Sequence, residues 1–256
     1  MISLMCADFA PPSPAACFIF DLDGTLQDFV AVFNEMSQRV NEELALQTSP
    51  EKLAELDTFI RSQMQGQSSK YIIVKILWNV AKRMGLSWRR RFTYINACNR
   101  HYRALIPDIQ IFPGVPEALD EIRNQGFPTA IQSSASTEEI QHRMAKYQDF
   151  LTKYIDLVLG RDNVPQMKPA PDGILLAAEH FHVPPTRCVY IGDMETDMQA
   201  ARAARAVAVG VLTGFDNAER LTAAGAEFIL PSVAELPAAV PGILALVEER
   251  AGPTGN

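Results

Sequence analysis

The hydrophobic positions of this chain follow a strand-and-helix alternation through most of its length. Short apolar runs, bounded by turn residues, are separated by segments in which apolar residues recur every three or four positions. Runs of this kind are typical of strands buried on both faces of a parallel sheet. The predicted strands are residues 17–20, 129–133, 155–159, 188–191, 207–211 and 228–230. Because right-handed crossovers place helices on both faces of such a sheet, the pattern predicts a three-layer α/β fold.

Residues 28–108 interrupt this alternation, because apolar positions there keep only the helical period. Four apolar stripes predict four amphipathic helices, enough for a small bundle with its own core. The stripes run over 32–44, 53–64, 72–84 and 88–102, with Gly85 ending the third and Ser87 preceding the fourth. We therefore predict two domains, an α/β core from 1–27 and 109–256 and an inserted α-helical domain from 28–108.

Composition and charge restrict the function classes. Hydrophobic residues make up 48% of the chain and charged residues 21%, as in ordinary soluble globular proteins. The net charge of -7 lacks the basic bias with which nucleic-acid binders neutralise phosphates, so no nucleic-acid partner is expected. No apolar run approaches the roughly 20 residues that span a bilayer, so no membrane association is expected.

The cysteines favour a reducing compartment. Cys6, Cys17, Cys98 and Cys188 show no Cys-x-x-Cys spacing and are expected to be reduced thiols. Residues 1–16 contain no Lys or Arg, and prolines interrupt their apolar stretch, so a secretory signal is not expected. We predict a cytoplasmic protein.

Two carboxylates follow the first predicted strand directly. Asp21 and Asp23 flank Leu22, and Gly24 allows a sharp turn just beyond them. Open α/β sheets bind ligands at the carboxyl ends of their strands, where two carboxylates can converge on a cation or form a nucleophile and acid pair. The same residues would also serve as a polar turn that closes a strand. The pattern alone leaves both interpretations open.

The segment Asp21-Leu22-Asp23-Gly24-Thr25-Leu26 resembles the first motif of the haloacid dehalogenase-like superfamily of aspartyl phosphotransferases. Further matches follow in the family's order. They are Ser133 at the end of the strand 129–133, Lys168 in Lys-Pro-Ala-Pro-Asp, and Asp193 and Asp197 after the strand 188–191. The resemblance extends from about Cys17 to about Leu236. It is strongest to the phosphoglycolate phosphatase group, which implies a Rossmann-like core with an inserted α-helical cap.

By this resemblance, Asp21 is the nucleophile and forms an aspartyl-phosphate. Asp23 protonates the leaving oxygen and later deprotonates the water that hydrolyses the intermediate. Ser133 donates a hydrogen bond to a phosphoryl oxygen, helped by the backbone N–H of Ser134. Lys168 balances the charge of Asp21 and the phosphoryl group. Taken singly, the serines would equally serve as helix caps, and Lys168 as a solvated loop charge.

The resemblance also implies a Mg²⁺ site with oxygen ligands. Asp21, the backbone carbonyl of Asp23 and Asp193 would hold the ion, and Asp197 would support the ion or its waters. As an alternative, Asp197 is a carboxylate of a first helical turn, where the helix dipole favours negative charge.

The predicted function is that of a Mg²⁺-dependent phosphatase, a monomer or homodimer that hydrolyses a small phosphorylated metabolite, phosphoglycolate-like or a sugar phosphate. Asp23 disfavours a dehalogenase, because cleavage of a carbon–halogen bond needs no proton for the leaving group. Two alternatives stay open, a phosphomutase of the β-phosphoglucomutase type and a non-catalytic binding module that retains the fold.

Substrate specificity in capped enzymes depends on side chains that the cap brings to the site. The polar segment 65–70 lies between two apolar stripes, and its Lys70 is the candidate to meet a substrate anion. An ordinary connection between helices is the alternative for this segment. Trp78 and Trp88 are expected in the core of the cap.

Two residues depart from the family pattern. Phe29 stands where relatives often carry a small hydroxyl residue, which is expected to alter the pocket near the cap hinge. Arg205 stands where a Gly usually ends the helix after the fourth motif, so a less tight turn is expected there.

Overall fold

The computed structural model describes residues 15–64 and 72–251, and within these ranges six strands form one parallel sheet. The strands are β1 (Cys17–Phe20), β2 (Thr129–Gln132), β3 (Leu157–Leu159), β4 (Cys188–Gly192), β5 (Val207–Val211) and β6 (Phe228–Leu230). Their order in the sheet is β3-β2-β1-β4-β5-β6, and every neighbouring pair is parallel. The predicted parallel α/β fold is therefore confirmed.

The central strand β1 is buried on both faces, as its apolar run predicts. Phe18 and Phe20 belong to the apolar cluster on one face of the sheet. Cys17 and Ile19 belong to the cluster on the other face, where the sulfur of Cys17 lies 3.3 Å from that of Cys188 on β4. Side chains alternate between faces along a strand, so a run without polar residues requires cover on both sides.

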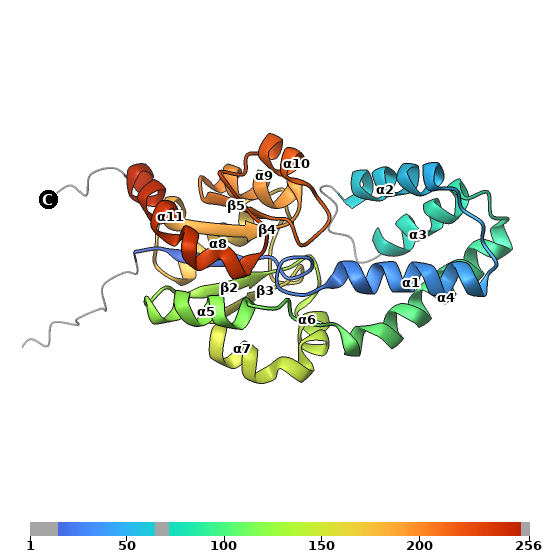
Figure 1. The fold of residues 1–256 in the computed structure, drawn as a ribbon, viewed down its shortest axis with the longest axis horizontal. Helices are drawn as coiled ribbons and strands as arrows, with labels where there is room; N and C mark the ends of the chain where they lie inside the picture. Colours follow the sequence, from blue (N-terminus) through green and yellow to red (C-terminus); the bar gives the residue numbers. More distant parts are fainter. Residues whose placement is uncertain (1–14, 65–71, 252–256) are drawn as a thin grey trace, which may run out of the picture.

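Helices supply that cover in two layers (Figure 1). The helices on the face of Phe18 are α5 (Val115–Asn124), α6 (Thr137–Arg143), α7 (Gln148–Tyr154) and α11 (Leu236–Ala251). Those on the opposite face are α8 (Asp172–His180), α9 (Glu195–Ala204) and α10 (Ala218–Ala224). Short 3₁₀ turns are η1 (Ile106–Asp108), η2 (Ala145–Tyr147), η3 (Pro185–Arg187) and η4 (Val233–Glu235). None of the helices in the described ranges is long and apolar enough to cross a membrane.

Four further helices lie in the segment where a cap is expected, beyond one end of the sheet (Figure 1). They are α1 (Phe29–Glu43), α2 (Pro50–Met64), α3 (Ile72–Arg83) and α4 (Trp88–Leu105). Val32, Met36 and Val40 of α1 pack against small residues of α4 in one apolar cluster, and α2 and α3 share a second. These clusters are separate from the two that cover the sheet. The helices between 28 and 108 thus have apolar cores of their own.

The position of Trp88 corrects the sequence analysis. Its side chain is 61% exposed, and that of Phe92 on the next turn is 53% exposed. The buried face of α4 carries Ala97, Cys98 and Leu105, because small residues let α4 approach α1 closely. The Phe92 ring lies 5.0 Å from that of the half-buried Trp78 and 6.2 Å from that of Trp88, so these rings cover one another at the cap surface.

The turn after α9 is also tighter than predicted. Arg205 adopts the left-handed conformation, with φ of 61°, and its N–H bonds to carbonyls of the last helical turn. The next N–H, that of Ala206, donates to the carbonyl of Ala201 at 2.9 Å. These are the bonds of a glycine-type helix end. Arg205 forms that end despite its Cβ, which costs about 1–2 kcal/mol in this conformation.

Candidate active site

The predicted site residues come from different segments and meet at the carboxyl edge of the sheet. Asp21 directly follows β1, Ser133 directly follows β2, and Asp193 directly follows β4. All three are buried. Parallel pairing of β1 with both β2 and β4 places these strand ends side by side. The topology therefore brings together residues that lie up to 172 positions apart in the chain.

Lys168 lies between two buried carboxyl groups. Its Nζ is 2.5 Å from Oδ1 of Asp21 and 2.6 Å from Oδ1 of Asp197. The lysine is only 7% exposed, so it is not the solvated loop charge that was its alternative interpretation. Burial opposes its charge, but Asp197 and Asp21 raise the pKa of Lys168 well above its ordinary value. The lysine is therefore held as a cation beside Asp21.

Asp21 has an unusual protonation equilibrium. Burial raises the pKa of this carboxyl group to about 7, against the opposing effect of Lys168 and with further increases from Asp197 and Asp23. A carboxylate that loses its hydration in this way gains from any additional positive charge that binds beside it. Perturbed carboxyl groups at the end of a central strand are typical of functional sites.

Asp193 is enclosed by two loops that lack side chains at the points of closest approach. Its Oδ1 accepts a hydrogen bond from Thr25 Oγ1 at 3.3 Å, and its Oδ2 accepts one from the backbone N–H of Phe215 at 2.9 Å. A Cβ at Gly24 would lie 2.5 Å from Oδ2, and one at Gly214 only 1.8 Å from it. Burial, Asp21 and Asp197 raise the pKa of Asp193 well above its ordinary value.

Asp197 has both of its oxygens engaged. Oδ2 accepts the backbone N–H of Met194 at 3.0 Å across the start of α9, and Oδ1 contacts Lys168. The expected position in a first helical turn is therefore present, and the contact with Lys168 is an addition that the sequence analysis missed. The role of Asp197 toward a metal ion stays a prediction.

Arg143 is a second residue that the sequence analysis missed. Its Nη1 lies 2.6 Å from Oδ1 of Asp23, and the arginine is only 7% exposed. Burial opposes the charge, but Asp23 and Tyr102 raise the pKa of Arg143 above its ordinary value. The sequence did indicate a buried arginine, because Arg143 lies on the same apolar face of α6 as Ile140 and directly precedes the buried Met144. A charged residue on the apolar face of a helix requires a partner.

The remaining predicted residues differ in their placement. Ser133 is buried, and its Oγ accepts the N–H of Ala135 at 3.1 Å, which leaves the hydroxyl proton available for donation. Ser134 is exposed at the same strand end. Ser136 and Glu139 form a capping box at the start of α6, in which each side chain accepts the backbone N–H of the other residue. Lys70 and the rest of its segment 65–70 lie outside the described residues.

Comparison with known proteins decides the family. Residues 18–211, more than half of the chain, match the model of the haloacid dehalogenase-like hydrolases. The chain belongs to this family. The predicted family and the predicted fold are therefore confirmed, and all four motifs of this hydrolase lie within the matched range.

Curated relatives of the hydrolase are phosphoglycolate phosphatases. The chain is 29% identical to that of Escherichia coli (strain K12) over 126 residues, which are 49% of either chain, so the match spans about half the length of that relative. It is 27% identical to the phosphoglycolate phosphatase of Neisseria meningitidis over 222 residues, which are 85% of this chain and 90% of the relative.

Solved structures similar to the hydrolase support the fold. A family hydrolase from Deinococcus radiodurans, crystallised with phosphate and sodium, superposes with a TM-score of 0.71 at 24% identity and covers 91% of this chain and 98% of its own. A Thermotoga maritima protein, provisionally assigned as a β-phosphoglucomutase, gives 0.69 at 22% identity over 89% and 99%.

The donor set of the hydrolase fits a divalent cation. Asp21, Asp193 and Asp197 are buried carboxyl groups, of which Asp21 and Asp197 pair with Lys168, so a further positive charge would relieve the repulsion among them. Oxygen donors of this kind suit Mg²⁺. Within 15–64 and 72–251, however, no cluster of three or more His, Cys, Asp or Glu side chains is arranged to hold a metal. The fit therefore depends on Asp21, Asp193 and a backbone carbonyl.

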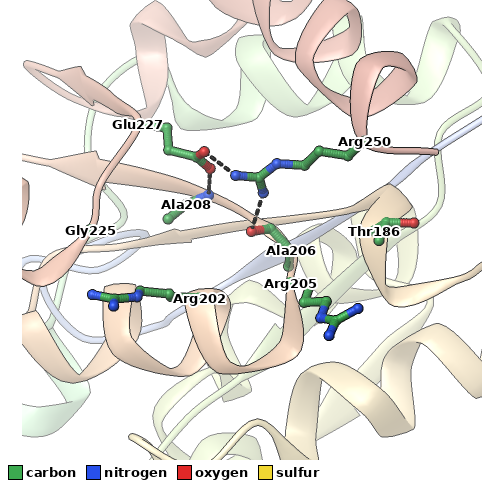
Figure 2. A pocket seen from close by; sticks show the side chains of 8 residues that line it. All are labelled: Thr186, Arg202, Arg205, Ala206, Ala208, Gly225, Glu227 and Arg250. Carbon is green, nitrogen blue, oxygen red and sulfur yellow. Dashed lines mark hydrogen bonds and ion pairs between the residues drawn. The ribbon is translucent and has the colours of Figure 1, made fainter. Parts of the chain in front are cut away.

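The amino edge of the sheet holds a different kind of cavity, of about 510 Å³ (Figure 2). Arg250 pairs there with Glu227 and donates to the carbonyl of Ala206 at 2.8 Å. Arg202 and Arg205 also line this cavity, but their side chains extend away from one another and are exposed. No predicted site residue of the hydrolase lines this cavity.

Proposed function

We propose that the protein is a Mg²⁺-dependent phosphatase that hydrolyses a small phosphorylated metabolite through an aspartyl-phosphate on Asp21. The observation that carries the proposal is the burial of Asp21 at the end of the central strand, in contact with Lys168. Such a carboxylate is positioned and partly stripped of water, as an attacking nucleophile requires. The phosphoglycolate phosphatases among its relatives support a phosphorylated substrate.

In the first step, Asp21 attacks phosphorus and the substrate alcohol leaves. Lys168, held as a cation beside Asp21, offsets the negative charge of the phosphoryl oxygens. The Ser133 hydroxyl donates a hydrogen bond to one of these oxygens, and the backbone N–H of Ser134 supplies a second donor. Donors fixed in this way need no reorganisation during the reaction.

Asp23 acts on protons in both steps. It protonates the leaving oxygen when the aspartyl-phosphate forms and deprotonates the water that attacks the intermediate. Asp23 is separated from Asp21 by one residue, and its carboxylate contacts Arg143 rather than Lys168. The two carboxylates of the motif therefore have different partners, in agreement with different roles.

Asp21, Asp193 and the backbone carbonyl of Asp23 would hold Mg²⁺, with Asp197 in a supporting role. When bound, the ion supplies positive charge at the phosphoryl group and at the buried carboxylates. Asp197 orients Lys168 toward Asp21 through its own contact with the lysine. A cytoplasmic location and a monomer or homodimer stay predictions.

A substrate panel tests the proposal. The purified protein is incubated with 2-phosphoglycolate, several sugar phosphates and 4-nitrophenyl phosphate, with Mg²⁺ and with a chelator, and released phosphate is measured. We expect Mg²⁺-dependent phosphate release from at least one small metabolite. Conversion of β-glucose 1-phosphate to its 6-phosphate without phosphate release would establish a phosphomutase instead. Absence of any turnover across the panel would favour a binding module.

A further inference from the structure

We propose that Arg143 is a positioning residue that fixes the orientation of the Asp23 carboxylate for proton transfer. The inference rests on the proposed function, in which Asp23 is the acid and base. Among the described residues, Arg143 forms no hydrogen bond or ion pair with Asp21 or Lys168, so its effect on the reaction passes through Asp23.

The contact is specific in its geometry. Arg143 Nη1 donates to Oδ1 of Asp23 over 2.6 Å, and the two residues lie 120 positions apart in the chain. This bond occupies one oxygen of Asp23 and leaves Oδ2 to face a reacting group. A carboxylate held by one oxygen loses rotational freedom about its terminal bond, so the other oxygen is presented in one direction.

Packing alone does not account for an arginine at this position. Its Nε is buried and has no hydrogen-bond partner among the described residues. Replacing a buried ion pair by an apolar side chain of similar volume is often neutral or stabilising, because it removes the desolvation cost. The packing of Ile140 and Met144 on the buried face of α6 therefore does not by itself require the pair of Arg143 and Asp23.

The cap restricts the guanidinium group from another side. The ring of Phe29, the first residue of α1, lies 5.7 Å from Cζ of Arg143, within the range of a cation–π contact. The Phe29 ring also contacts that of Tyr102 on α4, at 6.2 Å. Asp23 is therefore connected through Arg143 to two helices of the cap. This contact gives Phe29 a definite role at the position where relatives often carry a small hydroxyl residue.

The test separates orientation of Asp23 from a structural role of the arginine. Arg143→Leu, Arg143→Lys and Asp23→Asn are compared by rapid-quench measurement of alcohol release in the first step. Two substrates are used, an alkyl phosphate that the wild type hydrolyses and 4-nitrophenyl phosphate, whose leaving group hardly needs a proton. Arg161→Leu is the matched control, because Arg161 pairs with Glu139 of the same helix at 2.7 Å and does not contact Asp23.

We expect Arg143→Leu to slow alcohol release from the alkyl phosphate by about 10- to 100-fold and from the aryl phosphate by less than about 5-fold, since general acid help is worth 10²–10⁴-fold in total. Arg143→Lys should recover part of the loss. The double variant Arg143→Leu with Asp23→Asn should be no slower than Asp23→Asn alone, because both changes remove one function. Thermal unfolding confirms that each variant is folded, and Arg161→Leu should match the wild type.

Equal losses for the two leaving groups, or losses that add fully to those of Asp23→Asn, would overturn the inference. A rise in KM with unchanged kcat would instead make Arg143 a substrate-binding residue. If the wild type hydrolyses its substrate and all Arg143 variants do so equally well, only this inference fails. A wild type without any hydrolysis would remove the proposed function and this inference together.

Discussion

The two edges of the sheet, at the carboxyl and the amino ends of its strands, differ in whether their charged side chains are buried or exposed. Within the described residues, the buried charged side chains gather at or near the carboxyl edge, and they are Asp21, Arg143, Lys168, Asp193, Asp197 and Asp216. At the amino edge, the arginines of the cavity in Figure 2 are exposed or half-exposed, and Arg250 has Glu227 as its partner. Both edges are rich in ionisable groups, but these groups are buried only at the carboxyl edge.

This difference is the one that we expect between a reaction site and a solvated surface. Taking a charge out of water costs several kcal/mol unless partners compensate for it. At the carboxyl edge compensation is incomplete, because Lys168 pairs with both Asp21 and Asp197, and the buried Asp193 has no ion-pair partner among the described residues. A bound cation would supply the missing positive charge, whereas the arginines of the amino edge are exposed to solvent.

The largest effect is expected for Asp21→Asn. The variant lacks the nucleophile, so turnover should fall by about 10⁴-fold or more, and no phosphoenzyme should be trapped after acid quench. Circular dichroism should show an intact fold, because the substitution is nearly isosteric. Persistent turnover with a labelled phosphoenzyme would contradict the assignment of Asp21.

The second effect concerns the buried lysine. Lys168→Met keeps most of the side-chain volume but leaves Asp21 and Asp197 without their shared cation. We expect kcat to fall by about 10²- to 10³-fold, as for removal of a preorganised charge-stabilising group. The control is Arg250→Met at the amino edge, which also removes a cation paired with a carboxylate. Comparable activity losses in both variants would abolish the distinction between the edges.

A smaller effect is the pH dependence of stability. Because the folded pKa of Asp21 is about 7 and its ordinary value is 3.8, the folded protein binds more protons than the unfolded chain between these values. Stability of the metal-free wild type should therefore decrease as pH rises from about 4 to about 7, and then stay level. The variant Asp21→Asn should not show this decrease in stability, because its side chain does not titrate.

Melting curves of both proteins in chelator, from pH 5 to pH 8, measure this effect. Between pH 5 and pH 8, the Tm of the variant should rise relative to that of the wild type by on the order of 5 °C. Addition of Mg²⁺ to the wild type should reduce the difference at pH 8. A pH-independent difference would show that burial does not perturb Asp21.

The smallest effect is expected for Arg205→Gly at the amino edge. Glycine relieves the left-handed strain of about 1–2 kcal/mol but adds about 0.5–1 kcal/mol of unfolded-state freedom. The free energy of unfolding should rise by about 0–1.5 kcal/mol, measured by urea denaturation. Turnover should be unchanged, and a clear loss of activity would mean that the amino edge has a catalytic function.

Local periodicity predicted most of the fold. The apolar runs gave the strands to within two residues, because a strand buried on both faces has no polar residues to confuse the pattern. The third predicted strand begins later, at Leu157, since Ile155 is the C-cap of α7. Trp88 was misplaced because an apolar stripe does not say which of two faces meets the neighbouring helix.

The site was predictable where it depends on motifs and unpredictable where it depends on contacts between them. Asp21, Ser133 and Asp193 were predicted from their resemblance to the family's motifs, and in the structure each directly follows a strand. The pairing of Lys168 with Asp197 and that of Arg143 with Asp23 join segments far apart in the chain. No local pattern encodes such pairs, since they follow from the packing of α6 and of the loop before α8 onto the sheet.

Phe215 makes the cap and the core difficult to exchange independently. Its backbone N–H holds Asp193, while its ring lies 6.5 Å from that of Phe29 and 6.2 Å from that of Phe33, both on α1. One residue therefore transmits the position of the cap to a carboxylate that would hold the metal. Chimeras that graft a relative's cap onto this core will need residue 215 to be chosen together with the graft.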